Sequence, residues 1–277
     1  MNASSTAAVT TDTLDVSDGT IYYEVRGQGQ PVLLVAAPMD ASSFAPLADL
    51  LAPDHLVITT DPRGIGRSRL HDPEQDCTPE QRADDLSALL THLGVGPAVV
   101  LGSSGGAVTV LALAQEHPEQ VQTVIAHEPP LQELLEDRAD LRQQTEGMIA
   151  SYLSGDVKGA WVQFLAAANI WMPDEAIEGV FLSNREPQVV ADEHYQFAHM
   201  LRGTARWEPD LEALRSSTAR IVVGIGEDSA GQLCDRASRA LARALDLEPT
   251  LFPGDHIGFA EDPTAFADRL RTVLDRA

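Results

Sequence analysis

The order of hydrophobic and polar positions along the chain predicts short strands that alternate with amphipathic helices. Continuous apolar runs at 31–37 and 121–126 are typical of strands that are buried on both faces of a sheet. In 79–93 the apolar residues return every three or four positions, between the N-cap candidate Thr78 and Gly94. We expect further strands at 13–16, 21–25, 56–60, 98–101, 220–225 and 249–252, and further helices at 44–52, 107–115, 231–245 and 263–275.

The alternation stops between residues 131 and 206, where only helical patterns occur. These helical stretches are expected at 131–153, 156–170, 174–183 and 188–202. Strands that alternate with helices form a mostly parallel sheet with helices on both faces. We therefore predict an α/β core made of 13–130 and 207–277, an all-helical cap at 131–206, and a polar tail at 1–12.

Composition and charge limit the classes of partner and the cellular compartment that we expect. The 277 residues are 44% hydrophobic, enough for a large core, and the formal net charge of −23 argues against nucleic acid or an anionic membrane as a partner. The N-terminus has no basic segment followed by an apolar one, and no apolar run is long enough to span a membrane. Cys77 and Cys234 form no CxxC pair, which suits a reducing compartment. We expect a cytoplasmic protein that acts on a small molecule, and its oligomeric state stays open.

The stretch Gly102-Ser103-Ser104-Gly105-Gly106 connects a predicted buried strand to a predicted helix. A phosphate-binding loop of this type would need a lysine, and a flexible linker would have polar flanks. The remaining interpretation is G-x-S-x-G, a sharp turn that presents Ser104 as a nucleophile beside the N-terminus of a helix. Ser103 has the wrong offset and is expected to be a packed neighbour.

His256 is the candidate base for this serine. A serine hydroxyl is a weak nucleophile unless a base removes its proton. A histidine in a loop is usually just solvated, but His256 follows the last predicted strand. Catalytic groups of open α/β sheets gather at the carboxyl ends of the strands, where Ser104 is also expected.

With these residues in place, the chain resembles an α/β-hydrolase-fold enzyme that carries a helical cap. Three stretches carry the resemblance: residues 61–68 are similar to the family's D-x-R-G-x-G-x-S loop, the elbow lies at Ser104, and Pro253-Gly254-Asp255-His256 is similar to its late P-G-x-x-H. The similarity covers residues 13–277, although the cap matches only in kind. The resemblance implies the α/β-hydrolase fold and a hydrolase that needs no cofactor.

The acid that orients His256 has two candidates. The resemblance places it after strand 220–225, but Ser229 stands at the expected position and Asp228 comes one residue early. Other members of the fold place the acid after the strand that follows the elbow helix, which here is Glu128. A glutamate at the end of a buried strand is costly without a partner. We favour Glu128 and keep Asp228 as the alternative.

The oxyanion hole also departs from the family pattern. Many members have His-Gly after the strand at 31–35, whereas this chain has Ala36-Ala37-Pro38-Met39. Two backbone N–H groups must point at the developing alkoxide. Gly105 is expected to supply one. Pro38 has no N–H, so the second comes from Ala37 or Met39, and we choose Ala37.

No cofactor or metal site is expected. The Gly224-Ile225-Gly226 stretch lacks the third glycine of a dinucleotide loop, and His194 and His199 are five apart, which does not place them on adjacent turns of an α-helix. Some cap aromatics should line an apolar substrate cavity, although most such residues form cores. The candidates are Trp161, Phe164, Trp171, Phe181, Tyr195, Phe197 and Trp207.

The sequence as a whole predicts a serine hydrolase for a carboxylic ester or lactone of a small apolar molecule, working through an acyl-enzyme. Other activities of the fold remain alternatives, namely C–C bond hydrolysis, acyl transfer and a cofactor-free haloperoxidase-like reaction. Epoxide and haloalkane hydrolysis are disfavoured because their nucleophile is a carboxylate. The altered oxyanion loop also leaves open a non-catalytic ligand-binding relative.

Overall fold

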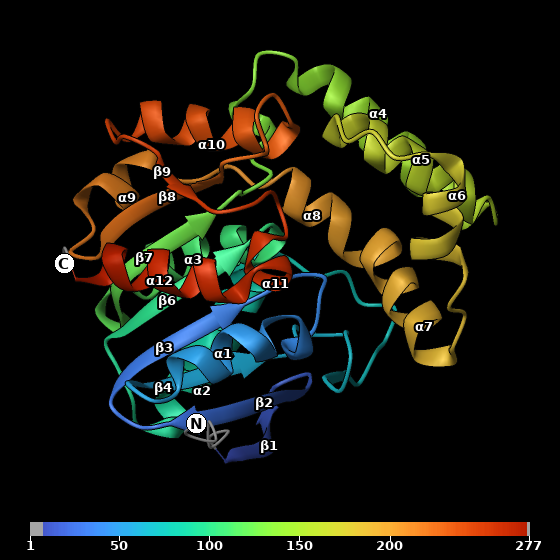
Figure 1. The fold of residues 1–277 in the computed structure, drawn as a ribbon. Helices are drawn as coiled ribbons and strands as arrows, with labels where there is room; N and C mark the ends of the chain where they lie inside the picture. The colour runs from blue at the N-terminus through green and yellow to red at the C-terminus, as the bar shows by residue number, and fades with distance from the viewer. Residues whose placement is uncertain (1–7, 276–277) are drawn as a thin grey trace, which may run out of the picture.

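A nine-stranded sheet forms the centre of the protein (Figure 1). The computed structural model describes residues 8–275. The strand order is β1-β2-β4-β3-β6-β7-β8-β9, and β5 pairs with β2 at one side. The strands are β1 (Val9–Val16), β2 (Gly19–Gly27), β3 (Gln30–Val35), β4 (His55–Thr60), β5 (Arg69–Leu70), β6 (Ala98–Ser103), β7 (Val121–His127), β8 (Arg220–Gly226) and β9 (Thr250–Phe252).

The six strands from β4 to β9 along the sheet order run parallel, and β1 and β2 are antiparallel to their neighbours. Alternate residues of β3 enter different cores, because Leu33 packs into one apolar cluster and Val32 and Leu34 into the other. This is why the sequence of a strand buried on both faces is a continuous apolar run. The predicted mostly parallel sheet is confirmed.

Two layers of helices cover the faces of the sheet. The cluster that contains Val32 also contains residues of α1 (Ala45–Leu51), α11 (Gly258–Glu261) and α12 (Pro263–Leu274). The cluster that contains Leu33 includes residues of α2 (Pro79–Leu93), α3 (Gly105–Glu116), α9 (Leu211–Ser216) and α10 (Leu233–Ala244). The described residues also form three short 3₁₀ turns, η1 (Ala41–Phe44), η2 (Pro118–Gln120) and η3 (Gln132–Leu134), of which η3 lies in the segment expected as the cap.

The cap lies beyond one end of the sheet (Figure 1). It has its own apolar cluster, in which Trp161 stacks on Phe181 and meets Phe197 edge-on. Two of its segments are π-helical, so their turns are wider than those of an α-helix. The cap elements are α4 (Arg138–Leu153), α5 (Val157–Ala168), α6 (Asp174–Ile177), η4 (Glu178–Leu182), α7 (Pro187–Tyr195), η5 (Gln196–Met200) and α8 (Leu201–Ala205).

One predicted boundary needs correction. Strand β1 begins at Val9 and pairs with β2 over its whole length, so residues 9–12 belong to the sheet and not to a tail. Its first residues are exposed, and an exposed edge strand lacks the apolar pattern of a buried one. Of the rest of the expected tail, residues 1–7 lie outside the described residues.

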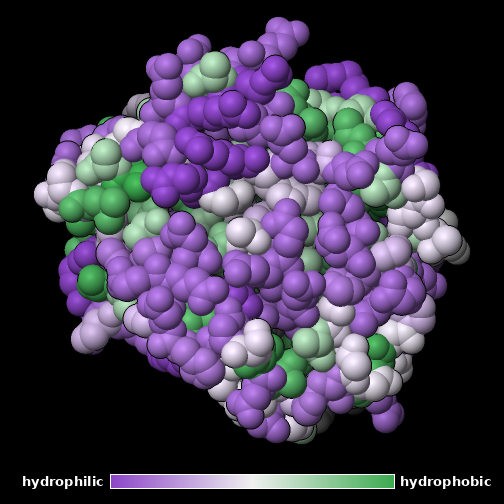
Figure 2. Space-filling model, turned by 180° about the vertical axis from the view of Figure 1, so that it is seen from behind, coloured by the Kyte–Doolittle hydropathy of each residue, from purple (hydrophilic) through white to green (hydrophobic). Residues whose placement is uncertain are grey.

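The face opposite to that of Figure 1 is mainly hydrophilic, with apolar residues in small separate groups (Figure 2). In the described part of the chain, no helix has the length and apolar character needed to cross a bilayer.

Candidate active site

Ser104 lies in the turn between the end of β6 and the start of α3. Its backbone has φ 56° and ψ −126°, a conformation that costs a non-glycine residue about 1–3 kcal/mol. The flanking glycines permit this turn: a Cβ on Gly102 would lie 2.2 Å from the carbonyl oxygen of Gly106, and one on Gly106 would lie 2.1 Å from that of Val35. Strand and helix therefore approach more closely than larger residues would allow.

Ser104 and Ser103 differ in what their hydroxyls contact. Ser103 is fully buried, with its Oγ 3.0 Å from Nδ1 of His127. Burial lowers the pKa of His127 to about 4, so this imidazole is neutral at pH 7. Ser104 borders a mostly apolar cavity, and its side chain does not cap α3. The structure thus leaves Ser104 accessible and Ser103 packed.

His256 and Glu128 form a close pair beside this turn. The Nδ1–H group of His256 donates to Oε2 of Glu128 at 2.6 Å, and the buried carboxylate also accepts from the Gly226 N–H through Oε1 at 2.8 Å. Both carboxylate oxygens therefore have a donor. Asp228 is exposed, and among the described residues its carboxylate makes no hydrogen bond with His256. The structure brings Glu128 to the imidazole and leaves Asp228 in solvent.

The backbone explains how Glu128 reaches this position. It follows β7 with φ 53°, and its N–H donates to the carbonyl oxygen of Gly224 at 3.0 Å. Packing requires a glycine at position 226, since a Cβ there would lie 2.7 Å from the carbonyl oxygen of Gly254, in the loop that carries His256. Gly226 therefore lets that loop cross close to the end of β8. This close packing accounts for a glycine at position 226 without a bound dinucleotide.

The pKa values of the two partners are shifted so that the carboxylate is more acidic and the imidazole more basic than usual. Burial works to raise the pKa of Glu128, but the hydrogen bond and the charge of His256 outweigh it, so the pKa is below its ordinary value. Burial works to lower the pKa of His256, but Cys234 and Glu128 outweigh it, and this pKa is well above the ordinary 6.5. In its neutral form such an imidazole is a strong base for the proton of a serine hydroxyl.

Ala37 and Gly105, the expected oxyanion donors, are neighbours. A Cβ on Gly105 would lie 2.7 Å from the carbonyl oxygen of Ala37, and both residues line the cavity with Ser104. As the first residue of α3, Gly105 has an N–H without an intrahelical acceptor. The Ala37 loop is held by the buried Asp61, whose Oδ1 accepts from the Ala41 N–H at 2.9 Å.

The cavity beside Ser104 lies between the cap and the sheet and has a volume of about 110 Å³. Ser104 and His256 border it from the core, and the cap contributes Met148, Phe164 and Met200. The lining is mostly apolar, with amide and hydroxyl groups at a few points. Of the seven cap aromatics expected from the sequence, Phe164 lines the cavity, whereas most of the others pack into apolar clusters and Trp171 is 87% exposed.

Cys234 is the site residue that sequence reasoning missed. It lies in the first turn of α10 and lines the cavity, and its Sγ is within 4.8 Å of ligand atoms of both Glu128 and His256. These three side chains could in principle bind a metal ion, but Glu128 already has donors on both oxygens. No pattern in the sequence pairs Cys234 with His256, because only the fold brings α10 to the loop after β9.

This sheet, with a serine elbow at the carboxyl end of one strand and a helical cap above it, defines an α/β protein with a hydrolase-type site. A family model described as alpha/beta hydrolase fold matches residues 31–168. The chain is 32% identical to the uncharacterized hydrolase YraK of Bacillus subtilis over 269 residues, which cover 95% of this chain and 96% of the relative. The chain belongs to the α/β-hydrolase fold family.

Two further similarities concern proteins with named activities. A zearalenone hydrolase of Bionectria ochroleuca is 28% identical over 272 residues, which cover 93% of this chain and 95% of that protein. The solved structure of Est816, described as an N-acyl homoserine lactone degrading enzyme, has a TM-score of 0.69 at 21% identity, covering 94% of this chain and 99% of that one. The relatives named as hydrolases support hydrolase activity, and the structural likeness confirms the fold.

Proposed function

We propose that the protein is a cofactor-independent serine hydrolase that cleaves a carboxylic ester or lactone of a small apolar molecule. The observation that carries the proposal is the 2.6 Å contact between His256 and the buried Glu128, on the same cavity as Ser104. A buried carboxylate on Nδ1 fixes the tautomer in which Nε2 can accept a proton. The lactone-degrading description of Est816 supports a lactone as one form of the substrate.

In this mechanism, Ser104 attacks the carbonyl carbon while His256 takes the hydroxyl proton. Glu128 orients the ring and stabilises the imidazolium. The backbone N–H groups of Gly105 and Ala37 bind the oxyanion, and the nearby N-terminus of α3 favours its charge. His256 then gives its proton to the leaving alcohol, and water, activated by the same histidine, releases the acid.

The surroundings of the site support a small apolar substrate. The cavity lies beneath the cap and is lined mainly by apolar side chains, with Met148, Phe164 and Met200 on the cap side. Apolar walls with a few polar groups are typical of small-molecule sites. Both cysteines are free thiols, which supports the proposal that the enzyme works in the cytoplasm.

The test is covalent labelling with a fluorophosphonate together with hydrolysis of p-nitrophenyl esters and lactones. We expect wild-type protein to be labelled on Ser104 and to turn over, and Ser104→Ala and His256→Ala to do neither. Ser103→Ala is the matched control and should keep most of the activity. If the wild type is not labelled and does not turn over, the proposal is wrong and a non-catalytic binding protein with an altered oxyanion loop takes its place.

A further inference from the structure

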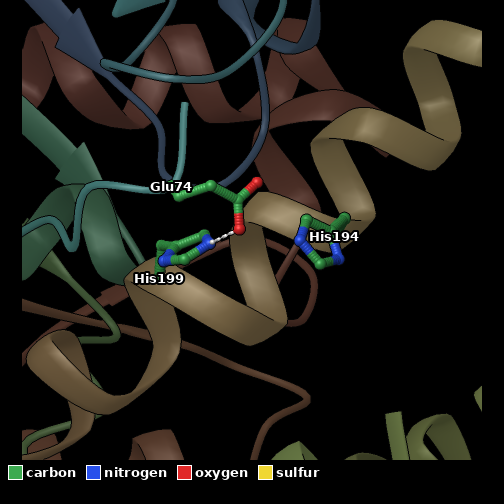
Figure 3. Close-up of side chains that lie close together, drawn as sticks. All are labelled: Glu74, His194 and His199. Atoms are coloured by element: carbon green, nitrogen blue, oxygen red, sulfur yellow. Dashed lines mark ion pairs between the residues drawn. The ribbon is translucent and has the colours of Figure 1, made fainter. Parts of the chain in front are cut away.

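Glu74, His194 and His199 form a cluster of potential metal ligands outside the candidate active site (Figure 3). Glu74 comes from the core, in the segment between β5 and α2, whereas His194 and His199 come from the cap. One ligand atom from each residue lies within 4.8 Å of the other two. The three side chains therefore meet across the boundary between cap and core.

The π-helical turn η5 explains why the two histidines are adjacent. In an α-helix, residues five apart point in different directions, and the spacing therefore predicts no shared ligand site. The turn at Gln196–Met200 is wider, with i→i+5 hydrogen bonding, and it realigns residues at this spacing. The ring centroids of His194 and His199 are 5.7 Å apart. The expectation that these histidines are not on adjacent turns is wrong for this reason.

His199 is oriented as a metal-binding histidine is. Its Nδ1 lies 3.0 Å from Oδ1 of Asp76, and because a carboxylate only accepts, Nδ1 carries the hydrogen. In the neutral ring, Nε2 then presents a lone pair. This atom is buried, has no hydrogen-bond partner among the described residues, and faces Oε2 of Glu74 at 3.5 Å. A carboxylate behind a ligating histidine is the usual outer partner of a metal site.

The spacing suits a tetrahedral ion. Bonds of about 2.0–2.2 Å from zinc to nitrogen and oxygen place two ligand atoms roughly 3.4 Å apart. The Nε2 of His199 and the Oε2 of Glu74 are 3.5 Å apart. His194 has a ligand atom within 4.8 Å of those of Glu74 and His199 and completes the set after a side-chain adjustment. Glu74 is exposed, so water can take the fourth position.

We propose that Glu74, His194 and His199 bind a divalent transition-metal ion such as Zn²⁺ and that the ion fastens the cap to the core. The same two segments are already joined, because the Cys77 N–H donates to the carbonyl oxygen of His199 at 2.9 Å and the Tyr195 hydroxyl donates to that of Gln75 at 3.1 Å. The site is thus held in place before the metal binds. His199 directly precedes Met200 and Leu201, which line the substrate cavity, so the ion would stiffen a wall of that cavity.

The test is metal titration of tag-free, chelator-treated protein, by calorimetry with Zn²⁺ and by the visible absorption of Co²⁺. We expect one equivalent to bind to the wild type, at least tenfold weaker binding to His194→Ala and Glu74→Gln, and unchanged binding to His71→Ala. His71 is the matched control because it is exposed and close to Glu74 in the sequence. These variants avoid the packed His199, so loss of folding does not confuse the result.

Thermal unfolding gives a second readout that needs no enzymatic activity. An ion that binds only the folded protein raises the melting temperature of that protein, and this rise should disappear in His194→Ala. Absence of saturable binding would overturn the proposal. Equal binding to wild type, His194→Ala and Glu74→Gln would also overturn it, by placing the ion elsewhere. A Cys234→Ala variant that alone loses binding would assign the ion to the cavity instead.

Discussion

Replacing Glu128 by glutamine tests the proposed triad at its most specific contact. The carboxylate has two oxygens, one accepting from His256 Nδ1–H at 2.6 Å and the other from the Gly226 N–H at 2.8 Å. A glutamine has a single oxygen and an NH₂ group. Because the Gly226 N–H is a fixed backbone donor, we expect the amide oxygen to stay there and the NH₂ to face His256. The imidazole must then accept at Nδ1 and carry its hydrogen on Nε2, where the serine proton should go.

The size of the effect follows from this change of tautomer. The same carboxylate-to-amide change in a Ser-His-Asp triad lowers kcat by about 10⁴ while leaving the geometry intact. For Glu128→Gln we expect a loss of about 10³–10⁴, which corresponds to about 4–5.5 kcal/mol of lost transition-state stabilisation. If the amide turns the other way, a buried donor lacks an acceptor, at a cost of about 1–3 kcal/mol in stability.

The assay is steady-state hydrolysis of a p-nitrophenyl ester, with thermal unfolding to show that each variant is folded. Asp228→Asn is the matched control, because it makes the same chemical change on an exposed carboxylate. We expect its kcat to stay within about twofold of the wild type, as is usual for a surface substitution. The reasoning is refuted if Asp228→Asn collapses while Glu128→Gln keeps a tenth or more of the activity.

The remaining predictions concern pH, packing and the cavity thiol. Because the pKa of His256 is raised and only its neutral form is a base, kcat/KM should rise with pH through a midpoint above 6.5; a lower midpoint in the pH profile contradicts this. Gly106→Ala should destabilise the fold by at least about 1–3 kcal/mol in urea unfolding, because its Cβ would overlap a strand carbonyl. Gly179→Ala, with open space around its Cβ, is the control, and equal stabilities would disprove the packing argument. Iodoacetamide should inactivate the enzyme through Cys234 rather than the buried Cys77, and Cys234→Ala should resist it; inactivation of this variant at the wild-type rate would exclude the cavity thiol.

Elements with strong local signals are predictable from the sequence. Helix α2 has the predicted bounds, because Thr78 and Gln81 form a capping box at its start and Gly94 adopts a left-handed conformation at its end. The buried parallel strands follow equally well from their apolar runs. The exposed strand β1 was placed too late, because its first residues take their conformation from pairing with β2 rather than from an apolar pattern.

The candidate site is less visible in the sequence, since its parts meet only through tertiary packing. Ser104 and His256 follow from motifs and strand order, but Glu128 and Asp228 are both plausible until burial and the contact with His256 separate them. The place of Cys234 in the site depends on where α10 begins relative to the loop that carries His256, and that loop comes from another part of the chain. The wide turn η5 has no local signature either, because Gln196–Met200 contains no glycine, proline or other residue type that would mark a change of helix type.

The sheet itself holds the three proposed catalytic residues, independently of the cap. Ser104 and Glu128 both have positive φ angles, and each is fixed by a backbone hydrogen bond to the next strand, from the Ser104 N–H to the carbonyl oxygen of His127 and from the Glu128 N–H to that of Gly224. The turn after β8 bonds in the same way to the loop that carries His256. The strain is therefore borne by neighbouring strand ends in a rigid sheet, where it cannot relax without breaking the ladder. The cap supplies mainly the walls of the cavity, and changes in its sequence can alter the substrate while the reacting groups stay in place.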